Sequence, residues 1–253
     1  MDLRKVTADD VRSAVARFME RSGLDRFSIR AALIDMDGVL YDSMKYHTLA
    51  WQHMMRDVGV ECTRDEFYLY EGMTGIATIN LLFRRAFGRD ADPDEGKRLY
   101  AVKTRYFHEF GDREPMPGAD RMLRALIRGG IKRVLVTGSA QASLLESLES
   151  DYPGAFTEQR RVTALDVKHG KPSPEPYIMG LKKAGEEAAN SIVIENAPLG
   201  VKAGHAAGCF TIAVTTGPIP ADEMWKAGAD LVLPSMPEFA DLLPAILEMY
   251  PVN

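Results

Sequence analysis

The spacing of hydrophobic positions divides this chain of 253 residues into two kinds of segment. Residues 7–21 and four segments between residues 44 and 108 carry apolar side chains at the intervals of an amphipathic helix. From residue 115 onward, short apolar runs typical of buried strands alternate with further helical segments. Strands are predicted at 30–35, 132–137, 160–164, 191–195, 209–215 and 230–233. Helices are predicted at 7–21, 44–59, 63–71, 74–88, 93–108, 139–150, 174–186, 198–207, 221–227 and 237–249, with one more after Gly118.

Strands that alternate with helices at short spacing predict an α/β fold, in which a parallel sheet is covered on both faces. The first strand is followed by four helices in a row, so the segment that begins near Asp42 is predicted to be an all-helical insertion. We therefore expect an N-terminal helical extension at 1–29, an α/β core at 30–42 and 115–253, and a helical domain at 43–114. Thr7 with Asp10 is spaced as an approximate capping box, and Thr63 and Thr74 are predicted N-caps.

Composition narrows the class of protein. Hydrophobic residues make up 46% of the chain, which can supply a sizeable core, and no apolar run reaches the roughly 18 residues of a membrane span. The first residues, MDLRKVTADDVR, lack the apolar region of a signal peptide. We expect a cytoplasmic protein without a membrane partner, as a monomer or weak dimer. A net charge of -5 without a dense cluster of Lys and Arg argues against a nucleic-acid partner. Cys62 and Cys209 have no metal-ligand spacing and are predicted to be ordinary reduced thiols.

Polar side chains follow several predicted strands at the same end. They are Asp35 and Asp37 after the first strand, Thr137 after 132–137, Lys171 soon after 160–164, and Glu195 with Asn196 after 191–195. Ligands of such sheets bind beyond the carboxyl ends of the strands. A buried carboxylate needs a pairing group, so two acids at one strand end require cations or hydrogen-bond donors nearby. Acids, a hydroxyl, a lysine and an amide together suit a metal-bound phosphate.

The two aspartates could perform phosphoryl transfer, which needs an in-line nucleophile, a proton donor and positive charge around the transferring group. Asp35, at the strand tip, is suited to attack as a carboxylate and form an aspartyl phosphate. Asp37 lies two residues on and would face the same way on a strand, so it can serve as general acid and then base. Gly38 permits the chain to leave the strand in a tight turn.

Phosphate oxygens and a metal ion need separate partners. Thr137 and the backbone amides of Gly138 and Ser139, at the predicted start of a helix, would hold phosphate oxygens. Lys171 would offset the crowding of carboxylates and phosphate. Glu195 and Asn196 offer oxygens to a hard cation, for which Mg²⁺ is the best match. Each element alone has an ordinary explanation as a turn, a cap or a proline-stiffened loop, and it is their order and placement at strand ends that favour a site.

Four stretches in this order, DMDGVLYDS, VLVTGSA, GKPSPEPY and IENAPLGVKAGHAAG, resemble the signature motifs of the haloacid dehalogenase superfamily, in the branch of β-phosphoglucomutase and its phosphatase relatives. The resemblance spans about 30–235. It implies a Rossmann-like parallel sheet core with a mobile helical cap inserted after the first motif, and dependence on Mg²⁺. By the same resemblance, Asp35 is the nucleophile, Asp37 is the acid and base, and Thr137 and Lys171 are phosphate ligands.

The resemblance also extends to the inserted helices. His47 and Trp51 match cap-hinge positions of that branch, although His47 could equally be a surface residue and Trp51 a core residue. The fourth motif usually offers two acids, the second of which binds Mg²⁺ directly, whereas this chain has Glu195 and Asn196. An asparagine can coordinate through its carbonyl oxygen, but the site loses one negative charge.

The first cap loop departs from the mutase branch, in which a lysine and an arginine hold the second phosphate of a sugar phosphate. The aligned positions here are Glu71 and Gly75. We hypothesise that Glu71 moves in with the closing cap and completes the magnesium shell that Asn196 leaves short. The alternative is that Glu71 merely ends a helix in solvent.

An acidic cap loop beside the metal leaves little room for a sugar and favours a small phosphorylated substrate, of which inorganic pyrophosphate is the simplest. Lys103 or Arg105, on the last cap helix, could meet the leaving phosphate, although basic residues on a helix are usually only solvated. The prediction is a Mg²⁺-dependent phosphohydrolase. The alternatives are a hexose-phosphate mutase of the β-phosphoglucomutase type, a sugar-phosphate phosphatase, and a non-catalytic phosphate-binding module.

Overall fold

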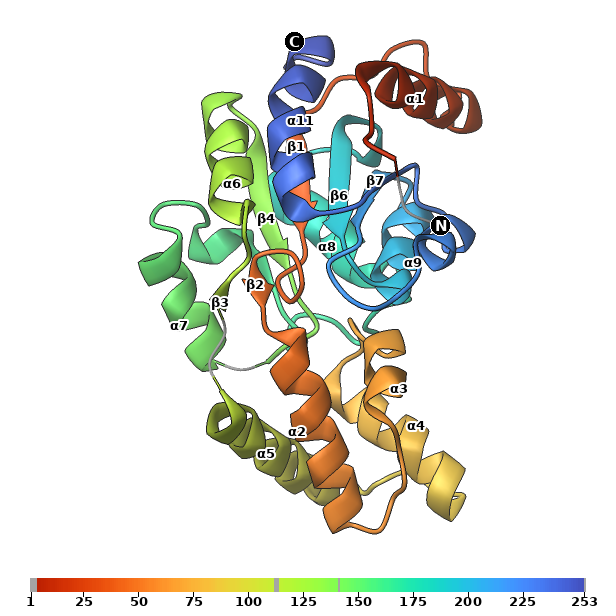
Figure 1. Cartoon of the computed structure of the whole chain (residues 1–253), viewed down its shortest axis with the longest axis vertical. Helices are drawn as coiled ribbons and strands as arrows, with labels where there is room; N and C mark the ends of the chain where they lie inside the picture. Colours follow the sequence, from red (N-terminus) through yellow and green to blue (C-terminus); the bar gives the residue numbers. More distant parts are fainter. Residues whose placement is uncertain (1–3, 112–113, 141, 253) are drawn as a thin grey trace.

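The computed structural model describes residues 4–111, 114–140 and 142–252. Its main sheet has six parallel strands in the order β5-β4-β1-β6-β7-β8 (Figure 1). The strands are β1 Ala31–Ile34, β4 Lys132–Val136, β5 Arg161–Val162, β6 Ser191–Glu195, β7 Phe210–Val214 and β8 Leu231–Leu233. Because β1 lies between β4 and β6, the residues that follow it lie near the middle of the row of carboxyl-terminal strand ends. The α/β fold with an inserted helical segment is confirmed.

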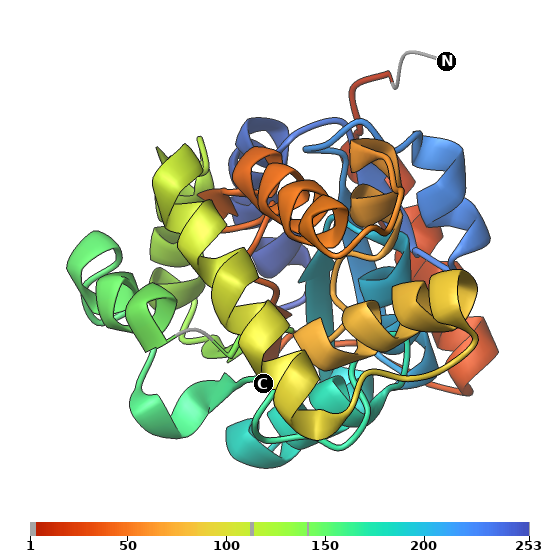
Figure 2. The same ribbon diagram turned by 90° about the horizontal axis from the view of Figure 1, so that it is seen from below.

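Four helices between β1 and β4 form the insertion, which we call the cap: α2 Met44–Asp57, α3 Arg64–Leu69, α4 Gly75–Phe87 and α5 Pro93–Phe110. They pack around a hydrophobic cluster of their own, which includes Met54, Phe67, Ile79, Leu82 and Phe83. Figure 1 shows the cap at one end of the molecule, and Figure 2 shows its helices lying across that end of the core.

A second, two-stranded sheet joins the cap to the core, and the hydrophobic pattern did not predict it. In this sheet β2 (Tyr41–Asp42) pairs antiparallel with β3 (Glu114–Pro115). Strands of two residues are too short to show an alternation of polar and apolar positions, which is why the pattern missed them. Residues 112–113, within the predicted helical domain, lie outside the described residues, as do residues 1–3 of the extension and residue 141.

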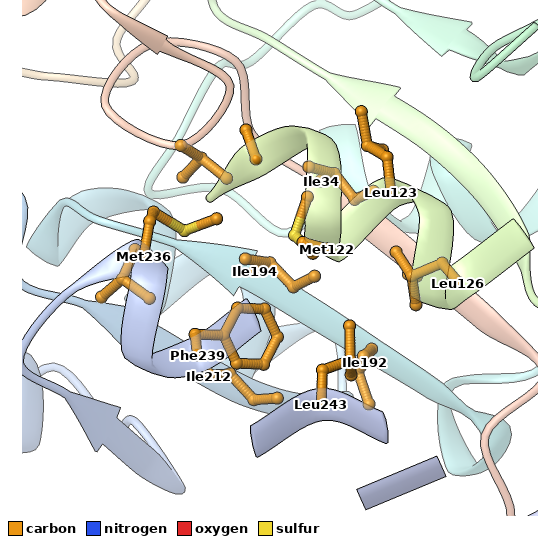
Figure 3. Close-up of a cluster of buried hydrophobic side chains, with 14 of the residues drawn as sticks. Ile34, Met122, Leu123, Leu126, Ile192, Ile194, Ile212, Met236, Phe239 and Leu243 are labelled. Atoms are coloured by element: carbon orange, nitrogen blue, oxygen red, sulfur yellow. The ribbon is translucent and has the colours of Figure 1, made fainter. Parts of the chain in front are cut away.

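Both faces of the main sheet are covered, because alternate residues of each strand point to opposite sides. One face packs against α6 (Ala119–Arg128) and α11 (Met236–Met249). Figure 3 shows this cluster, which includes Ile34, Ile192, Ile194, Ile212, Met122, Leu123, Leu126, Phe239 and Leu243. The other face packs against α8 (Glu175–Ala184) and α9 (Pro198–Ala206) through Leu33, Val134, Val136, Val193, Tyr177 and Ala203. Because both faces are buried, the positions open to a ligand are those at the ends of the strands.

The predicted N-terminal helix is α1, Ala8–Ser22. Its buried residues Val11, Ala14, Val15 and Phe18 belong to the same cluster as α6 and α11, so the helix packs on the core. The capping box of Thr7 and Asp10 is confirmed, as are the N-caps Thr63 and Thr74. At the other end of α1, Arg21 forms an ion pair of 2.5 Å with the buried Asp230.

Several predicted boundaries were wrong. The strand expected at 160–164 is only the two-residue β5, preceded by the 3-10 helix η1 (Glu158–Arg160). The helix expected at 139–150 is α7, Ala142–Asp151. The helix expected at 63–71 ends at Leu69, because the chain turns through Gly72 with a left-handed φ of 89°. The remaining elements are α10 (Ala221–Lys226) and η2 (Ala188–Asn190). In the described part of the chain, no helix has the length and apolar character to cross a membrane.

Candidate active site

The predicted residues gather where β1, β4 and β6 end. The amide of Asp35 donates to the carbonyl oxygen of Ile194 at 3.0 Å, so Asp35 extends the pairing of β1 with β6. The chain then turns, and the amide of Gly38 donates to the carbonyl oxygen of Tyr41 at 2.7 Å. Gly38 has a left-handed φ of 77°, and a Cβ there would lie 2.0 Å from Nδ2 of Asn196. Both the turn and the close packing of Asn196 therefore require glycine at this position.

Lys171 holds two buried carboxylates together. Its Nζ donates to Oδ1 of Asp35 and, at 2.6 Å, to Oε1 of Glu195. The hydroxyl of Tyr177 donates to the same oxygen of Glu195 at 2.7 Å, and the amides of Asn196 and Ala197 donate to its other oxygen. Both oxygens of Glu195 are thus engaged within the protein. This geometry differs from the metal-ligand role predicted for Glu195 and fits a residue that positions Lys171.

The protonation of this cluster depends on its charge balance. Burial raises the pKa of the Asp35 carboxyl well above its usual value, while the Lys171 ammonium opposes the shift. Burial would lower the pKa of Lys171, but the charges of Asp35 and Glu195 outweigh it, so that pKa is raised. Burial likewise raises the pKa of Glu71 well above its usual value. The site holds more carboxylates than cations, so an added cation would lower the pKa of these acids.

Asp37 lies at the end of a short hydrogen-bonded chain. Its Oδ1 accepts from the hydroxyl of Ser43 at 2.5 Å and lies 3.2 Å from Nε2 of His47. Nδ1 of the same ring lies 2.5 Å from Nζ of Lys103. Burial raises the pKa of Asp37, but His47 and the Ser43 hydroxyl more than offset it, and the pKa falls to about 2. Asp37 is therefore ionised at neutral pH and able to accept a proton.

The structure separates the two basic residues of α5. Arg105 is exposed and pairs with Glu109 on its own helix. Lys103, in contrast, is only 2% exposed and lies over the rings of Trp51 at 5.4 Å and Phe107 at 5.3 Å. Burial lowers the pKa of Lys103 to about 7. The general expectation of a solvated lysine was wrong here, because position 103 faces the core side of the cap, where His47 also lies.

The loop after β4 differs in part from the prediction. Thr137 is buried, and its amide donates to the carbonyl oxygen of Val162 at 2.9 Å. The amide of Ser139 donates to Oγ1 of Thr137 at 3.0 Å. Gly138 and Ser139 are not helical, and the described part of α7 is Ala142–Asp151, so these two residues do not form the first turn of a helix. The helix-dipole argument for phosphate binding is lost, although this loop still lines the cavity described below.

Asn196 is the residue that best fits a bound metal ion. Its Nδ2 donates to Oε1 of Glu71 at 2.9 Å, whereas its buried Oδ1 accepts no hydrogen bond from the described residues. An unpartnered buried oxygen is costly unless a ligand satisfies it, and oxygens are the donors that Mg²⁺ prefers. No group of three or more His, Cys, Asp or Glu within the described ranges is arranged to hold a metal. A site there would therefore depend on the amide oxygen of Asn196 together with Asp35 and Asp37.

Glu71 does not end its helix in solvent. Its side chain crosses from the cap to Asn196 of the core and is only 8% exposed. Gly72, the next residue, packs against the side chain of Lys171. The alternative of a solvated Glu71 is therefore wrong.

Two side chains of the candidate site were missed by sequence reasoning. Ser43 occupies the N-cap position of α2, but its hydroxyl caps nothing because it donates to Asp37 instead. Tyr177 lies at the end of the third motif and donates to Glu195. A serine directly before a helix is normally read as a cap, so nothing in the pattern pointed to a contact with Asp37.

A cavity of about 70 Å³ separates the cap from the core. The core lines it with Asp35, Asp37, Thr137, Gly138 and Ser139, and the cap lines it with residues that include His47, Trp51, Glu71, Tyr100 and Lys103. A water molecule occupies about 30 Å³ in the liquid, and typical small-molecule sites have roughly 300–1,000 Å³. In this arrangement of cap and core, the site therefore has space only for a very small ligand.

Comparison with known proteins finds relatives of this chain among phosphate-processing enzymes. The family model for haloacid dehalogenase-like hydrolases matches residues 29–208. Hexitol phosphatase A of Escherichia coli is 29% identical over 81% of this chain and 90% of its own length. The 2-deoxyglucose-6-phosphate phosphatase 1 of Saccharomyces cerevisiae is 27% identical over 82% of this chain and 88% of its own. A solved structure from Bacteroides vulgatus, provisionally described as a beta-phosphoglucomutase, is 41% identical with a TM-score of 0.93, and the match covers 96% of this chain and 99% of that one.

Proposed function

The chain belongs to the haloacid dehalogenase-like hydrolases, and from this membership and its site we propose that it is a phosphatase in which Asp35 is the nucleophile. The observation that carries the proposal is the placement of Asp35 against Lys171 on the floor of the cavity, with the ionised Asp37 two residues away. A non-catalytic phosphate binder would need Lys171 but neither aspartate.

The proposed reaction has two steps. First, a carboxylate oxygen of Asp35 attacks the phosphorus of the substrate, an aspartyl phosphate forms, and the bond from phosphorus to the leaving oxygen breaks. Second, water attacks the phosphorus, Asp37 accepts a proton from that water, and the bond to Asp35 breaks to release phosphate. Lys171, held by Glu195, stays charged beside Asp35 throughout and stabilises the negative charge of the transferring group.

The cofactor that we propose for this site is Mg²⁺. Asp35, Asp37 and the unpartnered oxygen of Asn196 would hold it, and Glu71 would support the site through its hydrogen bond with Asn196. When bound, the ion would supply positive charge close to the phosphate oxygens.

For the substrate, the geometry and the relatives favour different candidates. The small cavity and the acidic Glu71 above it favour a compact substrate, of which inorganic pyrophosphate is the simplest. An ionised Asp37 also suits a leaving phosphate, which is stable without an added proton, better than a sugar alkoxide. The two phosphatases named above, however, are named for sugar phosphates, and they favour a sugar-phosphate phosphatase over the pyrophosphatase expected from the sequence. We propose pyrophosphate from the geometry and keep a hexose or hexitol phosphate as the second candidate.

A substrate panel tests this proposal. Phosphate release in the presence of Mg²⁺ would be measured with pyrophosphate, glucose 6-phosphate, sorbitol 6-phosphate and an aryl phosphate. We expect the largest kcat/KM for pyrophosphate, because it is the smallest of the four substrates and the cavity beneath the cap is small. A larger kcat/KM for either sugar phosphate would establish the second candidate. No phosphate release from any of the four substrates would refute the proposed phosphatase activity.

The contact between Glu71 and Asn196 predicts coupling in metal binding. Glu71→Gln is expected to weaken Mg²⁺ binding about tenfold, and Asn196→Asp to strengthen it, because the first removes a negative charge near the ion and the second adds one. The residues touch, so the double variant should differ from the sum of the single changes by more than about 0.5 kcal/mol. Titration calorimetry with Mg²⁺ alone measures this without turnover. Additive effects would show that Glu71 does not act on the metal site through Asn196.

A further inference from the structure

The cap rests on the core at two glycines that belong to different core loops. A Cβ built on Gly138, in the loop after β4, would lie 2.7 Å from the carbonyl oxygen of Gly72 and 3.0 Å from that of Met73. A Cβ built on Gly170, directly before Lys171, would lie 2.8 Å from Cγ2 of Thr74 and 3.1 Å from its backbone nitrogen. The same cap loop, residues 72–74, therefore presses on both positions.

Nothing in the local backbone requires glycine at either place. Neither Gly138 nor Gly170 has a positive φ, so each could carry a side chain without strain in its own loop. The three atoms nearest to each added Cβ all belong to the cap loop on the other side of the interface. Non-bonded carbon and oxygen atoms do not pack at 2.7 Å, so a methyl group at position 138 can be accepted only if the cap loop and the loop of residue 138 move apart.

The two obstacles differ in kind. Gly138 faces backbone carbonyl groups of the cap. These atoms are present whatever the side chain, so no substitution in the cap can remove them. Gly170 faces mainly the methyl group of Thr74, whose hydroxyl caps α4 by accepting a hydrogen bond from the amide of Ala77 at 3.3 Å. A serine at position 74 would keep the cap of the helix and remove that methyl group.

We propose that Gly138 and Gly170 are specificity-determining residues, because their missing side chains let the cap descend far enough to leave room only for a small substrate. With the cap in this position, Glu71 contacts Asn196, Gly72 packs on Lys171, and the cavity between cap and core is about 70 Å³. A side chain at either glycine holds the cap away, so the cavity grows and larger phosphate esters gain access. This inference rests on the proposed function for its substrate preference, but closure itself can be measured without turnover.

The experiment compares Gly138→Ala, Gly170→Ala and a matched control, Gly217→Ala. Gly217 also has an ordinary φ and faces the cap, but a Cβ there would meet Tyr68 at an ordinary 3.8 Å. Spin labels at Lys97→Cys on the cap and Lys226→Cys on the core, with Cys62 replaced by serine, report the separation of the two units with Mg²⁺ and inorganic phosphate present. Both labelled lysines are largely exposed, and Cys209 is buried and should stay unlabelled.

We expect the short distance between the two spin labels in the parent chain to be lost in Gly138→Ala and kept in Gly217→Ala. The kcat/KM ratio of pyrophosphate to glucose 6-phosphate should fall by about tenfold or more in Gly138→Ala, since a shift of about 1 Å can cost about 10²-fold in rate. Gly170→Ala should show a smaller change, and Thr74→Ser should reverse it in part in the double variant, because the backbone nitrogen of residue 74 remains 3.1 Å from the added methyl group. Thr74→Ser should not rescue Gly138→Ala.

The outcomes separate this inference from the proposed function. If Gly138→Ala and Gly170→Ala both keep the parent distance distribution, the closure role is overturned even if activity falls. If the parent chain hydrolyses neither pyrophosphate nor any of the phosphate esters, the proposed function fails while the distances still decide closure. If Gly138→Ala does not fold, the rescue of Gly170→Ala by Thr74→Ser decides the question, and its absence overturns the inference.

Discussion

Asp35→Asn is expected to lower kcat for phosphate release by about 10⁴-fold or more, while the protein keeps its fold. Asparagine has almost the shape of aspartate but cannot attack phosphorus as a carboxylate, so no aspartyl phosphate can form. The fold should tolerate the change well, because burial already penalises the charged form of Asp35. Phosphate release with the preferred substrate of the panel measures the loss, and thermal unfolding monitors the fold.

Asp241→Asn is the control for this prediction. Asp241 is exposed on α11 and pairs with Arg121, so its loss should leave turnover within a few-fold of the parent. Retention of more than about one hundredth of the activity in Asp35→Asn would show that another group is the nucleophile. Rapid acid quenching of the parent with substrate should also leave a phosphoryl adduct on the peptide that contains Asp35.

Lys171→Met is expected to destabilise the folded protein by about 3–5 kcal/mol at neutral pH. The lysine is 3% exposed and pairs with Asp35 and Glu195, so methionine leaves two buried carboxylates without their cation. Chemical unfolding in urea measures the loss. Lys226→Met is the control, since Lys226 pairs with Glu223 at the surface and such pairs contribute at most about 1 kcal/mol.

The pH dependence of this variant has a definite sign. Without Lys171, burial raises the pKa of Asp35 in the folded state further above its value in the unfolded chain. Over the pH range between the two values, the folded state binds more protons, so its stability falls as the pH rises. The deficit of Lys171→Met relative to the parent should therefore be smaller at pH 5 than at pH 8. An equal deficit at both values would mean that the destabilisation comes from lost packing and not from unpaired charge.

Much of the fold was predictable because each long element has a strong periodicity of its own. The strand that leads to Asp35 and the helices of the cap were readable in this way, and the four motifs gave the order of the site residues. The placement of Asp35 beside Thr137 follows from the sheet, since β1 pairs with β4. Lys171 follows β5, on the far side of β4, and its long side chain reaches across the end of β4 to Asp35. Strand-end reasoning was therefore enough to find the floor of the site.

The side of the site formed by the cap was harder to predict, because it depends on contacts between elements that are far apart in sequence. Lys103 and His47 are separated by 56 positions, and only the packing of α5 on α2 brings them together. Glu195 was predicted as a metal ligand from its place in a motif, whereas its oxygens turn to Lys171, Tyr177 and backbone amides. A motif fixes the position of a residue in the chain, but the direction of its side chain depends on neighbours that the motif does not contain.

The two-stranded sheet of β2 and β3 makes the helical insertion a removable cassette. Asp42 lies opposite Glu114 in an antiparallel pair, so the chain leaves and rejoins the core at points about 5 Å apart. A turn of two residues can bridge such a pair. Nature or an engineer could therefore exchange one roof for another of different shape, keep the reacting groups on the sheet unchanged, and so retarget the same chemistry to a new metabolite.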